Sequence, residues 1–524
     1  MNHFDKIVQG LRLSTAYPEP AGPVVHIETH ISHVFLAGPY AYKLKKPVNL
    51  GFLDFSTLER RHFFCQEELR LNRRLAPQLY LEVVPITGST TAPRIGGAGE
   101  VLEYAVKMRR FDQSGLLSTQ PLEDDLPERV AERVAAFHDS IPAVAPDEPF
   151  GRPEAVLAPM LANFEAIRTR LSDPSLLARL AGLESWTLAR HAELRPILEQ
   201  RRAAGFVREC HGDMHRGNIA LDQGEVLIFD GIEFNPGLRW IDIQSELAFL
   251  LMDLEEAGER GPARRLLNHY LELTGDYAGL KVLNFYQVYR ALVRAKVLAI
   301  RLDQADLSAE EAVRDRGGLS DYLTLAEGYT RPHSPCLCLV QGVSGSGKSR
   351  LALALRARLP LIHLRSDIER KRLFGFLAEA RTSSGGQVDG GIYGPEAGER
   401  TYGRLRELAC TLLMAGYSPL VDATFLKRAQ RETFIGLAQS QGCPCHLLIC
   451  EAPLEVVQER VRRRAAEGAD PSEAGVEVLA SQLALREPLT AEETSLSIPV
   501  DTTSAGYEEG VVRMLATDQA WVIS

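Results

Sequence analysis

The sequence has few cysteines, and none of them lies at the spacing of a common metal-binding motif. Its 524 residues include eight cysteines, and no Cys-x-x-Cys pair occurs. Cys336 with Cys338, and Cys443 with Cys445, are too close along the chain for an ordinary zinc knuckle, and no second pair lies at ligand spacing. Most of the cysteines flank apolar, strand-like runs. We therefore expect reduced, buried thiols in a cytoplasmic protein.

The sequence also lacks long hydrophobic runs and an excess of positive charge. No run of about 18 apolar residues occurs, so we expect no membrane-spanning helix. The first 17 residues lack the apolar segment of a secretory signal. The net charge is −10, which argues against long nucleic acid as a partner, because that role needs a basic face.

The chain does have enough apolar material for several folded domains. Its length favours several domains at about 100–200 residues each. Hydrophobic residues make up 45% and charged residues 24%, as in ordinary globular proteins. Residues 20–110 carry strand-like runs around one helix, residues 111–328 are mostly helical in pattern, and residues 329–335 form a linker with prolines. We predict a first domain, 1–328, with a small and a large lobe, and a second domain, 336–524, in which strands and helices alternate around a parallel sheet.

A polar loop followed by a strand, "HGDMHRGNIALDQGEVLIFDG" at residues 211–231, contains the first candidate site. Asp213 and Asn218 are five residues apart, and Asp230 follows the apolar run "VLIF". A carboxylate such as Asp213 can accept or orient an attacking hydroxyl. Asn218 and Asp230 supply the oxygen ligands that Mg²⁺ prefers. This spacing resembles the catalytic and metal-binding loops of kinase-like phosphotransferases, and the resemblance implies a phosphoryl-transfer site that uses ATP and Mg²⁺.

Such a site also needs a strand lysine on the ATP phosphates and a helix carboxylate that pairs with it. The run "AYKLKK" contains Lys43 and Lys45, which a strand would place on the same face. Glu67 and Glu68, on the following helix, are the candidate partners. We favour Lys43 with Glu68 and keep Lys45 and Glu67 as alternatives. Met108, in "YAVKM", is expected on the adenine side of the site.

These motifs resemble the catalytic and metal-binding loops of protein kinases and, more closely, those of the aminoglycoside phosphotransferase family. That family has H-G-D-x-x-x-x-N followed by a strand that ends in Asp. The resemblance covers about residues 20–300 and implies a bilobal, protein-kinase-like fold. No G-x-G-x-x-G precedes the lysine strand, which weighs against a protein kinase more than against a phosphotransferase. The run "IEFNPGLRWIDIQ" also looks similar to the family, and Asp242 within it is expected to anchor the loop rather than to do chemistry.

A glycine-rich segment, "GVSGSGKS" at residues 342–349, fits the Walker A pattern G-x-x-x-x-G-K-[ST] of a P-loop. It follows an apolar strand and precedes a helix, so its glycines can let backbone N–H groups surround phosphates. Lys348 is expected to reach the β- and γ-phosphates, and Ser349 to bind Mg²⁺, with the helix N-terminus adding its dipole. The nucleotide-binding residues predicted in this segment are Gly342, Ser344, Gly345, Ser346, Gly347, Lys348 and Ser349.

The segment "PLIHLRSDIERKRL" provides candidate groups for a second acceptor. It resembles the small P-loop kinases that include polynucleotide 5′-kinases, zeta-type toxins and chloramphenicol phosphotransferases, and the resemblance covers about residues 336–520. The resemblance implies that Asp367 is the general base and that Arg370 contacts the acceptor or the phosphates. It also implies a three-layer α/β fold with a parallel sheet. Tyr393, in a glycine-rich loop, is a candidate acceptor contact.

Two further features complete this second candidate site. Asp422 ends a third buried strand, and we expect it to be the Walker-B-type carboxylate behind Mg²⁺. Arg460 and Arg464 lie at i and i+4 on one face of a lid-like helix. The resemblance implies that these arginines close over the γ-phosphate and stabilise the charge that develops there.

The whole chain resembles a fused bacterial family that joins an aminoglycoside phosphotransferase-like domain to a predicted P-loop kinase domain. The fold class expected is α/β and α+β in two domains. The leading hypothesis is a bifunctional kinase that uses ATP and Mg²⁺ to phosphorylate hydroxyls of sugar-like or nucleotide-like small molecules. The alternative is a toxin-like or nucleotide 5′-hydroxyl kinase in the P-loop domain, with the first domain as a regulatory ATP-binding module. A third hypothesis makes one half a nucleotide sensor. The sequence identifies neither acceptor, and it does not give the oligomeric state.

Overall fold

The fold is described from a computed structural model. None of the helices in its described ranges has the length and apolar character needed to cross a membrane. The structure describes residues 2–18, 22–49, 51, 53–303, 307–332, 334–376, 392, 394–467 and 476–518, with side chains left out at 464–467 and 476.

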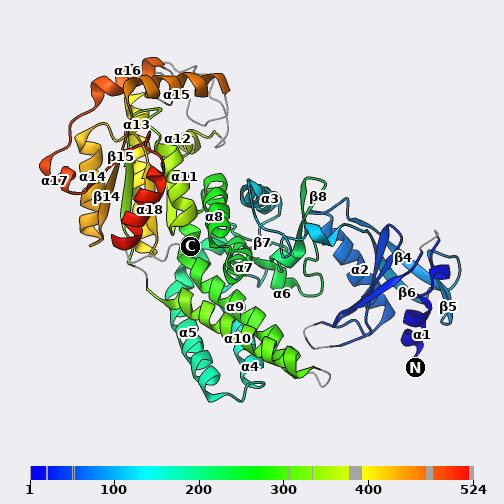
Figure 1. The fold of residues 1–524 in the computed structure, drawn as a ribbon. Coiled ribbons are helices and arrows are strands. Elements are labelled where there is room, and N and C mark those ends of the chain that lie inside the picture. The colour runs from blue at the N-terminus through cyan, green and yellow to red at the C-terminus, as the bar shows by residue number, and fades with distance from the viewer. Residues whose placement is uncertain are drawn as a thin grey trace. The chain divides into compact units, whose positions relative to one another are not determined.

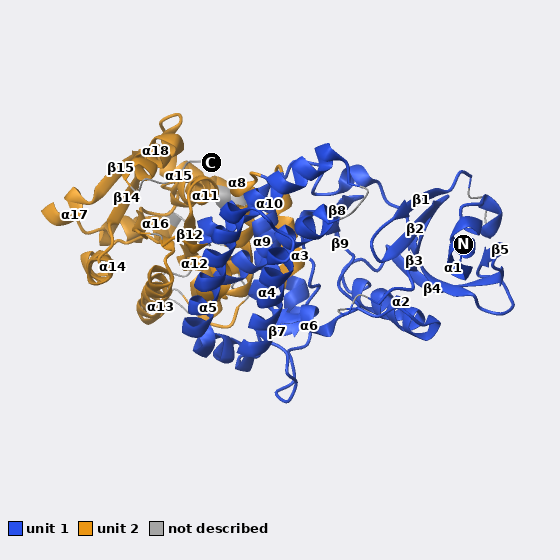
Figure 2. Cartoon of the chain, turned by 90° about the horizontal axis from the view of Figure 1, so that it is seen from below, with its two compact units in different colours: residues 1–122, 136–257, 285–329 blue, residues 123–135, 258–284, 330–524 orange. Residues whose placement is uncertain are grey.

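Contacts divide the chain into two compact units, drawn in different colours in Figure 2. The first unit contains residues 1–122, 136–257 and 285–329. The second unit contains residues 123–135, 258–284 and 330–524. The second unit thus takes two segments that the sequence analysis assigned to the first domain, 123–135 and 258–284. The predicted linker also begins inside a helix, α10, which ends at Thr330. The boundaries 1–328 and 336–524 stay a prediction about the two sequence domains.

The small lobe of the first unit is an antiparallel sheet in the order β1-β2-β3-β6-β4-β5. Its core lies between the sheet and the N-terminal helix α1, which the sequence analysis did not foresee. Because β3 has a side-chain period of two, alternate residues of this strand face α2 and can contribute to a site. The elements are α1 (His3–Gly10), β1 (Val25–Glu28), β2 (Ser32–Ala37), β3 (Tyr40–Lys45), α2 (Leu58–Asn72), β4 (Tyr80–Ser89), β5 (Ala92–Ile95) and β6 (Glu103–Arg109).

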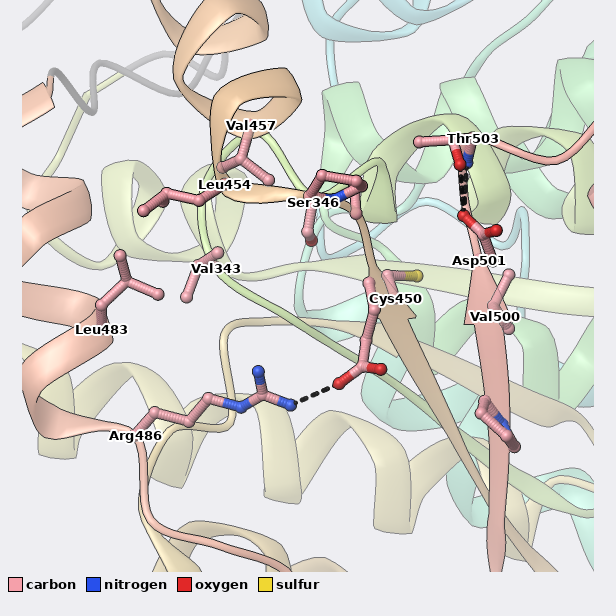
Figure 3. A pocket seen from close by; sticks show the side chains of 14 residues that line it. Val343, Ser346, Cys450, Leu454, Val457, Leu483, Arg486, Val500, Asp501 and Thr503 are labelled. Carbon is pink, nitrogen blue, oxygen red and sulfur yellow. Dashed lines mark hydrogen bonds and ion pairs between the residues drawn. The ribbon is translucent and has the colours of Figure 1, made fainter.

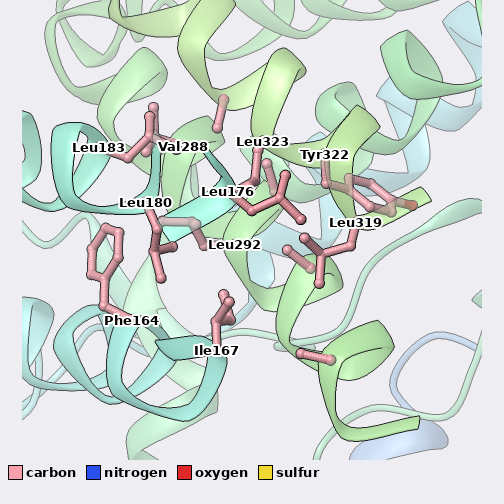
Figure 4. Close-up of a cluster of buried hydrophobic side chains, with 14 of the residues drawn as sticks. Phe164, Ile167, Leu176, Leu180, Leu183, Val288, Leu292, Leu319, Tyr322 and Leu323 are labelled. Atoms are coloured by element: carbon pink, nitrogen blue, oxygen red, sulfur yellow. The ribbon is translucent and has the colours of Figure 1, made fainter. Parts of the chain in front are cut away.

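The large lobe of the first unit is mainly helical, with two short antiparallel strand pairs, β7 with β10 and β8 with β9. Apolar side chains from α4, α5, α7, α9 and α10 form one buried cluster, and Figure 4 shows Phe164, Leu180 and Leu292 within it. Phe249 of this core lies against His215 of the loop that precedes β8, with ring centroids 5.6 Å apart. The elements are α4 (Pro153–Arg168), α5 (Pro174–Ala203), β7 (Val207–Glu209), β8 (Ile219–Asp222), β9 (Glu225–Ile228), α6 (Pro236–Arg239), β10 (Trp240–Asp242), α7 (Ile243–Glu256), α9 (Leu280–Leu302) and α10 (Ala309–Thr330).

The second unit is built on a parallel five-stranded sheet in the order β12-β13-β11-β14-β15. Every residue of β11 is buried, as expected for a parallel sheet covered on both faces. α11 and α18 pack on one face and α13 contacts β12 and β13 (Figure 1). The strands are β11 (Leu337–Gln341), β12 (Leu361–Arg365), β13 (Ser418–Asp422), β14 (Cys445–Glu451) and β15 (Ser497–Asp501).

The helices of the second unit come from all three of its chain segments, 123–135, 258–284 and 330–524. The mixed α/β architecture with a parallel C-terminal sheet confirms the predicted fold class. The helices are α3 (Leu126–Ser140), which begins in this unit, α8 (Arg260–Thr274), α11 (Lys348–Arg358), α12 (Ser366–Leu373), α13 (Pro395–Met414), α14 (Arg428–Ser440), α15 (Leu454–Glu467), α16 (Val476–Leu485), α17 (Ala491–Ser495) and α18 (Tyr507–Asp518).

Candidate functional site

The two candidate lysines of β3 meet the same carboxylate of α2. Nζ of Lys43 lies 2.9 Å from Oε1 of Glu68, and Nζ of Lys45 lies 2.7 Å from Oε2. Lys43 also lies 2.5 Å from Oδ1 of Asp230, whereas Lys45 contacts the buried Glu233. The side chain of Lys43 is 13% exposed and that of Lys45 is 1% exposed. Lys43 is therefore the lysine that faces the candidate metal ligand and solvent, and Lys45 is a buried partner of Glu68.

The alternatives to this arrangement lie elsewhere. Glu67 points away from the lysines and pairs with Arg70 at 2.9 Å. Met108 lies on β6, where it is paired with Ala41 of the neighbouring strand β3. The structure thus places Met108 beside the lysine strand, and its expected role on the adenine side of the site stays a prediction.

Charge pairing dominates the electrostatics of this cluster. Burial opposes the positive charge of Lys43, but Asp230 and Glu68 outweigh it and raise the pKa of Lys43 well above its usual value. Burial would raise the pKa of Glu68, but Lys43 and Lys45 lower it to about 2. Glu68 is therefore ionised at neutral pH, and the ion pair holds β3 and α2 in register at the site.

The candidate catalytic loop brings Asp213 and Asn218 together. Nδ2 of Asn218 donates to the backbone oxygen of Asp213 at 3.0 Å and to its Oδ2 at 3.2 Å. An amide that donates through Nδ2 keeps its Oδ1 free to accept. Nε2 of His215 lies 3.6 Å from Oδ2 of Asp213. Burial would raise the pKa of Asp213, but His215 lowers it to about 2, so that the carboxylate stays ionised at neutral pH.

Asp230 reaches the site through an unusual backbone conformation. Its φ is +63°, a left-handed value that non-glycine residues seldom adopt. The backbone N–H groups of Asp230 and Gly231 donate to Oη of Tyr80 at 3.1 Å and to Oδ1 of Asn72 at 2.8 Å. Such strain persists where the surroundings determine it, and it is common at functional sites. Here it turns the chain after β9 so that the carboxylate of Asp230 meets Lys43.

The residue that anchors the loop is Glu246 of α7, which the sequence analysis missed. Its Oε1 accepts from the backbone N–H groups of His211 and Gly212, both at 2.7 Å, and its Oε2 lies 3.0 Å from Nε2 of His138. Asp242, the expected anchor, instead pairs with Arg201 at 2.7 Å and caps α7. The only signal in the sequence was a second acidic residue one helical turn after Asp242.

The P-loop has backbone geometry that only glycine accommodates. Gly342, Gly345 and Gly347 have φ values of +154°, +81° and +96°. A Cβ on Gly342 would lie 2.4 Å from Oγ of Ser346, and one on Gly345 would lie 2.7 Å from a backbone oxygen of Val457. The glycines therefore serve both the turn and the close approach of neighbouring backbone. Within the loop, the backbone N–H of Ser344 donates to Oε1 of Gln482 at 2.8 Å, and that of Ser346 donates to the Val343 carbonyl at 3.1 Å.

The charged residues of the P-loop site lie at the carboxyl ends of the strands. Nζ of Lys348 donates to the backbone oxygen of Val343 at 3.0 Å, inside the loop. Oγ of Ser349 donates to Oδ2 of Asp422 at 3.0 Å. Burial would raise the pKa of Asp422, but the contact with His363 and the charge of Lys348 lower it to about 2. The structure thus brings Ser349 and Asp422 together as the expected metal-binding pair.

The remaining predicted residues of this site come from α12 and α15. Asp367 lies in the first turn of α12, directly after β12, and Nε of Arg370 lies 3.4 Å from Oγ1 of Thr401. Arg460 donates to Oγ1 and to the backbone oxygen of Thr502, at 2.9 and 3.0 Å. The side chain of Arg464 lies outside the described residues, as does Tyr393. The roles of these residues stay predictions.

The comparison with protein families decides the class of enzyme. Residues 56–283 match the model of the phosphotransferase enzyme family, and residues 337–489 match the model of an AAA domain. The protein is a phosphotransferase. The first matched segment contains the catalytic loop and Glu68 but not Lys43 or Lys45, and the second contains the P-loop and Asp422. Kinase-like and P-loop domains imply the use of a nucleotide. The fused architecture expected from the sequence is confirmed by the two matches.

Relatives of the phosphotransferase share this two-part architecture over most of their length. An uncharacterized protein of Mycobacterium tuberculosis is 29% identical over 466 residues, which cover 87% of this chain and 89% of the relative. A protein of Mycobacterium bovis matches with the same values. A match over 87% of this chain includes residues from both family-matched segments, so the likeness to these relatives extends over both parts.

Solved structures resemble single parts of the phosphotransferase. An amicoumacin kinase in complex with AMP-PNP, Ca²⁺ and Ami is 14% identical and covers 59% of this chain and 91% of its own, with a TM-score of 0.37. A sugar kinase from Janibacter sp. is 22% identical and covers 36% of this chain and 96% of its own, with a TM-score of 0.27. At such low scores neither likeness adds to what the family matches show.

A cavity beside the P-loop of the phosphotransferase has the size of a small-molecule site. Its volume is about 550 Å³, and it lies at the carboxyl ends of β14 and β15, below the start of α15 (Figure 3). Val343, Leu454 and Val457 give it apolar walls, and the ion pair of Arg486 with Glu451, at 2.9 Å, gives it a polar edge. Ligand pockets commonly combine this volume with this mix of walls.

The depressed pKa of Glu68 predicts how the stability of the phosphotransferase depends on pH. The folded pKa of about 2 lies below the ordinary 4.5, so the ionised carboxylate stabilises the fold above pH 4.5 and this contribution is lost as pH falls toward 2. At about 1.4 kcal/mol for each pKa unit, the contribution is a few kcal/mol. We expect Glu68→Gln to have a lower free energy of unfolding than the wild type at pH 7. We expect this difference in free energy to become smaller between pH 5 and pH 3.

Urea unfolding followed by tryptophan fluorescence measures this gap, because Trp186 and Trp240 both lie in the first unit. Glu82→Gln is the matched control, since its side chain is 57% exposed and pairs with Lys107 on the same sheet. The control is expected to differ little from the wild type at any pH. A gap for Glu68→Gln that stays constant from pH 7 to pH 3 would contradict the assignment.

Proposed function

We propose that the phosphotransferase has two kinase sites, one in each unit, and that each transfers a phosphoryl group from ATP to a hydroxyl of a small molecule. The observation that supports this proposal is the presence of a full set of groups in each unit. In the first unit, Lys43 is the candidate for binding phosphate and the ionised Asp213 is the candidate for binding the acceptor. Asn218 and Asp230 supply two oxygen ligands for a metal. The second unit has a P-loop, its lysine and a Ser349–Asp422 pair.

In the first site, the donor set fits a hard divalent cation. Oδ1 of Asn218 and the carboxylate of Asp230 are oxygen ligands of the kind that Mg²⁺ prefers. Bound Mg²⁺ would neutralise the charge of the phosphates during transfer. When nucleotide binds, the ammonium of Lys43 leaves Asp230 and contacts the phosphates. Its ion pair with Glu68 keeps the ammonium in place beside β3. Asp213 accepts a hydrogen bond from the acceptor hydroxyl, which aligns its oxygen with the phosphorus, and takes the proton late in the transfer.

In the second site, backbone N–H groups bind the phosphates. The glycine turns and the N-terminus of α11 direct N–H groups at the phosphates. Lys348 exchanges its contact with the Val343 carbonyl for the β- and γ-phosphates. Oγ of Ser349 and the carboxylate of Asp422 fit the same hard cation as the first donor set. Asp367 then receives the proton of the second acceptor hydroxyl.

The cavity beside the P-loop is the proposed place of the nucleotide base in the second unit. Its wall includes Val343 and Ser346 of the P-loop, so a nucleotide whose phosphates lie in the loop can extend into it. The apolar side chains of Leu454 and Val457 can pack on the faces of a purine ring. Thr503, at the end of β15, contributes polar atoms to the opposite wall.

The acceptors are proposed to be sugar-like or nucleotide-like small molecules. A purely regulatory first domain is the less favoured alternative, because a nucleotide sensor needs no carboxylate for an acceptor, yet Asp213 is present, ionised and held by Asn218 and His215. The two sites use different chemistry to hold the phosphates, which favours two acceptors rather than one duplicated activity.

An acceptor screen tests the proposal. The full-length protein is incubated with ATP, Mg²⁺ and panels of sugars, polyols, nucleosides and oligonucleotides with 5′-hydroxyls, and ADP release and product mass are recorded. The variants Asp230→Asn and Asp422→Asn each remove the metal carboxylate of one site. We expect two phosphorylated products, each lost in a different variant. A single product, or two products lost together in one variant, would contradict two independent sites, and oligonucleotide products would favour the end-kinase alternative.

A further inference from the structure

A buried histidine lies between the P-loop metal carboxylate and a helix that comes from outside the P-loop sequence. His363 is in the middle of β12, and its side chain is 0% exposed. Its Nε2 lies 3.5 Å from Oδ2 of Asp422, and its Nδ1 lies 3.6 Å from Oε1 of Glu272 on α8. Each imidazole nitrogen therefore faces a different carboxylate.

The ring of His363 is poised to bind both carboxylates. Among the described residues, neither nitrogen has a partner within ordinary hydrogen-bond geometry. Buried polar atoms are almost always hydrogen-bonded, and the contacts of a site are often long until its ligands bind. A neutral imidazole has one N–H and one acceptor nitrogen, so the ring donates to Asp422 and Glu272 together only as the imidazolium, whose positive charge lies between the two carboxylates.

Glu272 is itself held firmly within the second unit. Its Oε1 accepts from Arg356 at 2.7 Å, and the side chains of both residues are 5% exposed. Arg356 belongs to α11, the helix that begins with Lys348 of the P-loop. The carboxylate therefore lies between the P-loop helix and the histidine, with little freedom to move.

A second contact of α8 fixes the backbone of the same histidine. Oδ1 of Asn268 accepts from the backbone N–H of His363 at 2.7 Å, and Nδ2 of Asn268 donates to the backbone oxygen of Leu361 at 3.1 Å. The strand β12 is at the edge of the sheet, where backbone groups would otherwise lack partners. One amide of α8 thus completes the edge of the P-loop sheet at the residue that contacts Asp422.

The helix that provides these contacts belongs to the other family match. Residues 260–274 lie inside the segment 56–283 that matches the phosphotransferase family and outside 337–489, the segment that matches the AAA domain. By its contacts the helix nevertheless belongs to the second unit. The P-loop site is therefore built with a carboxylate from the sequence of its neighbour.

We propose that Glu272 is a positioning residue of the P-loop site, which orients His363 so that the histidine holds Asp422 toward Ser349 and the metal. This inference rests on the proposed function of the P-loop site. Groups that orient a metal ligand commonly change metal affinity or activity 10–100-fold when they are removed. The P-loop half alone, without α8, would then bind Mg²⁺ with a misaligned carboxylate.

The test measures metal-dependent nucleotide binding by the full chain. A parent variant carries Lys43→Met and Asp230→Asn, so that the first site has lost its phosphate and metal contacts. A fluorescent ATP analogue is titrated with and without Mg²⁺, and the Mg²⁺ concentration at half-maximal binding is recorded. Glu272→Gln and His363→Phe are each expected to raise this concentration at least 10-fold, with Mg²⁺-free binding unchanged. His363→Gln, whose amide can still donate to Asp422, is expected to recover part of the loss.

Arg265→Gln is the matched control, because Arg265 lies on the same helix but pairs with Glu128 of α3. It is expected to leave the Mg²⁺ dependence of the parent unchanged. Should His363→Phe not fold, Glu272→Gln decides alone, because it conserves volume. A Mg²⁺ dependence of Glu272→Gln equal to that of Arg265→Gln would overturn the positioning role while leaving the kinase proposal intact. A parent without Mg²⁺-dependent binding would overturn both.

Discussion

Replacing Lys348 with alanine is expected to lower the rate of the P-loop reaction about 10²–10³-fold, the usual cost of removing one preorganised group that stabilises transition-state charge. Nζ of Lys348 already lies inside the loop, 3.0 Å from the Val343 carbonyl, so its charge is in place before the phosphates arrive. The measurement is the steady-state rate of the product that depends on Asp422, at saturating acceptor. The product of the first site is expected to form at the wild-type rate.

Arg350→Ala is the control for this variant. It also removes one positive charge from α11, but the side chain of Arg350 is 77% exposed and pairs with Glu508 at 2.9 Å. Its loss is expected to change the rate less than about 2-fold, because exposed ion pairs contribute little. Equal losses for Lys348→Ala and Arg350→Ala would indicate a general effect of charge on the unit and would contradict a specific role in the loop.

The P-loop could be predicted from the sequence because its determinants are local. A short apolar strand, glycines at positions that need positive φ, and a helix that begins with Lys348 all lie within 15 residues or so of one another. The same holds for the pair of Asp213 and Asn218, whose contact is closed inside a single loop. Local geometry of this kind is fixed by the backbone preferences of the residues concerned.

The sequence indicated Glu68 as a partner of the lysines, and both contact it, but it could not give the second partner of each lysine. A strand period of two places Lys43 and Lys45 on the same face, but it does not tell which of them meets Asp230. That choice depends on a contact between residues 187 apart, and the partner of Lys45, Glu233, is 188 residues away. Nothing in the local pattern around Glu233 marks it as buried and paired, so this residue was missed.

The position of α8 shows a further limit of pattern reading. An apolar face predicts that a helix packs against other elements, but it does not predict which domain those elements belong to. The sequence does not distinguish Asn268 and Glu272 from other polar residues of a helix. Asn268 contacts the edge strand β12, at residues 93 and 95 positions later in the chain. For the same reason the sequence analysis placed residues 258–284 with the first domain, whereas their contacts place them with the second unit.

The carboxylate of Asp213 is held by Asn218 and His215, and this arrangement predicts the largest effect in the first unit. Asp213→Asn is expected to lower the rate of the first reaction about 10²–10⁴-fold, the range for loss of a positioned proton acceptor. Because the pKa of Asp213 is about 2, its carboxylate stays ionised from pH 5 to pH 8, and the wild-type rate is not expected to titrate through this residue. Nucleotide affinity is expected to remain within about 2-fold, since Lys43 and Asp230 are unchanged.

A carboxylate with so low a pKa is a weak base, so its contribution has to come from orientation and charge more than from early proton removal. Asn218 and His215 fix that orientation, and asparagine at position 213 would keep the size of the side chain but not the charge that His215 and the acceptor hydroxyl need. Glu225→Gln, at an exposed position of the adjacent hairpin, removes one negative charge near the site without these contacts and is expected to retain the wild-type rate. A rate for Asp213→Asn within 5-fold of that control, at about the same nucleotide affinity, would show that the first site does not act on a hydroxyl through Asp213, and the role of a nucleotide sensor would then account for this unit better than that of a kinase.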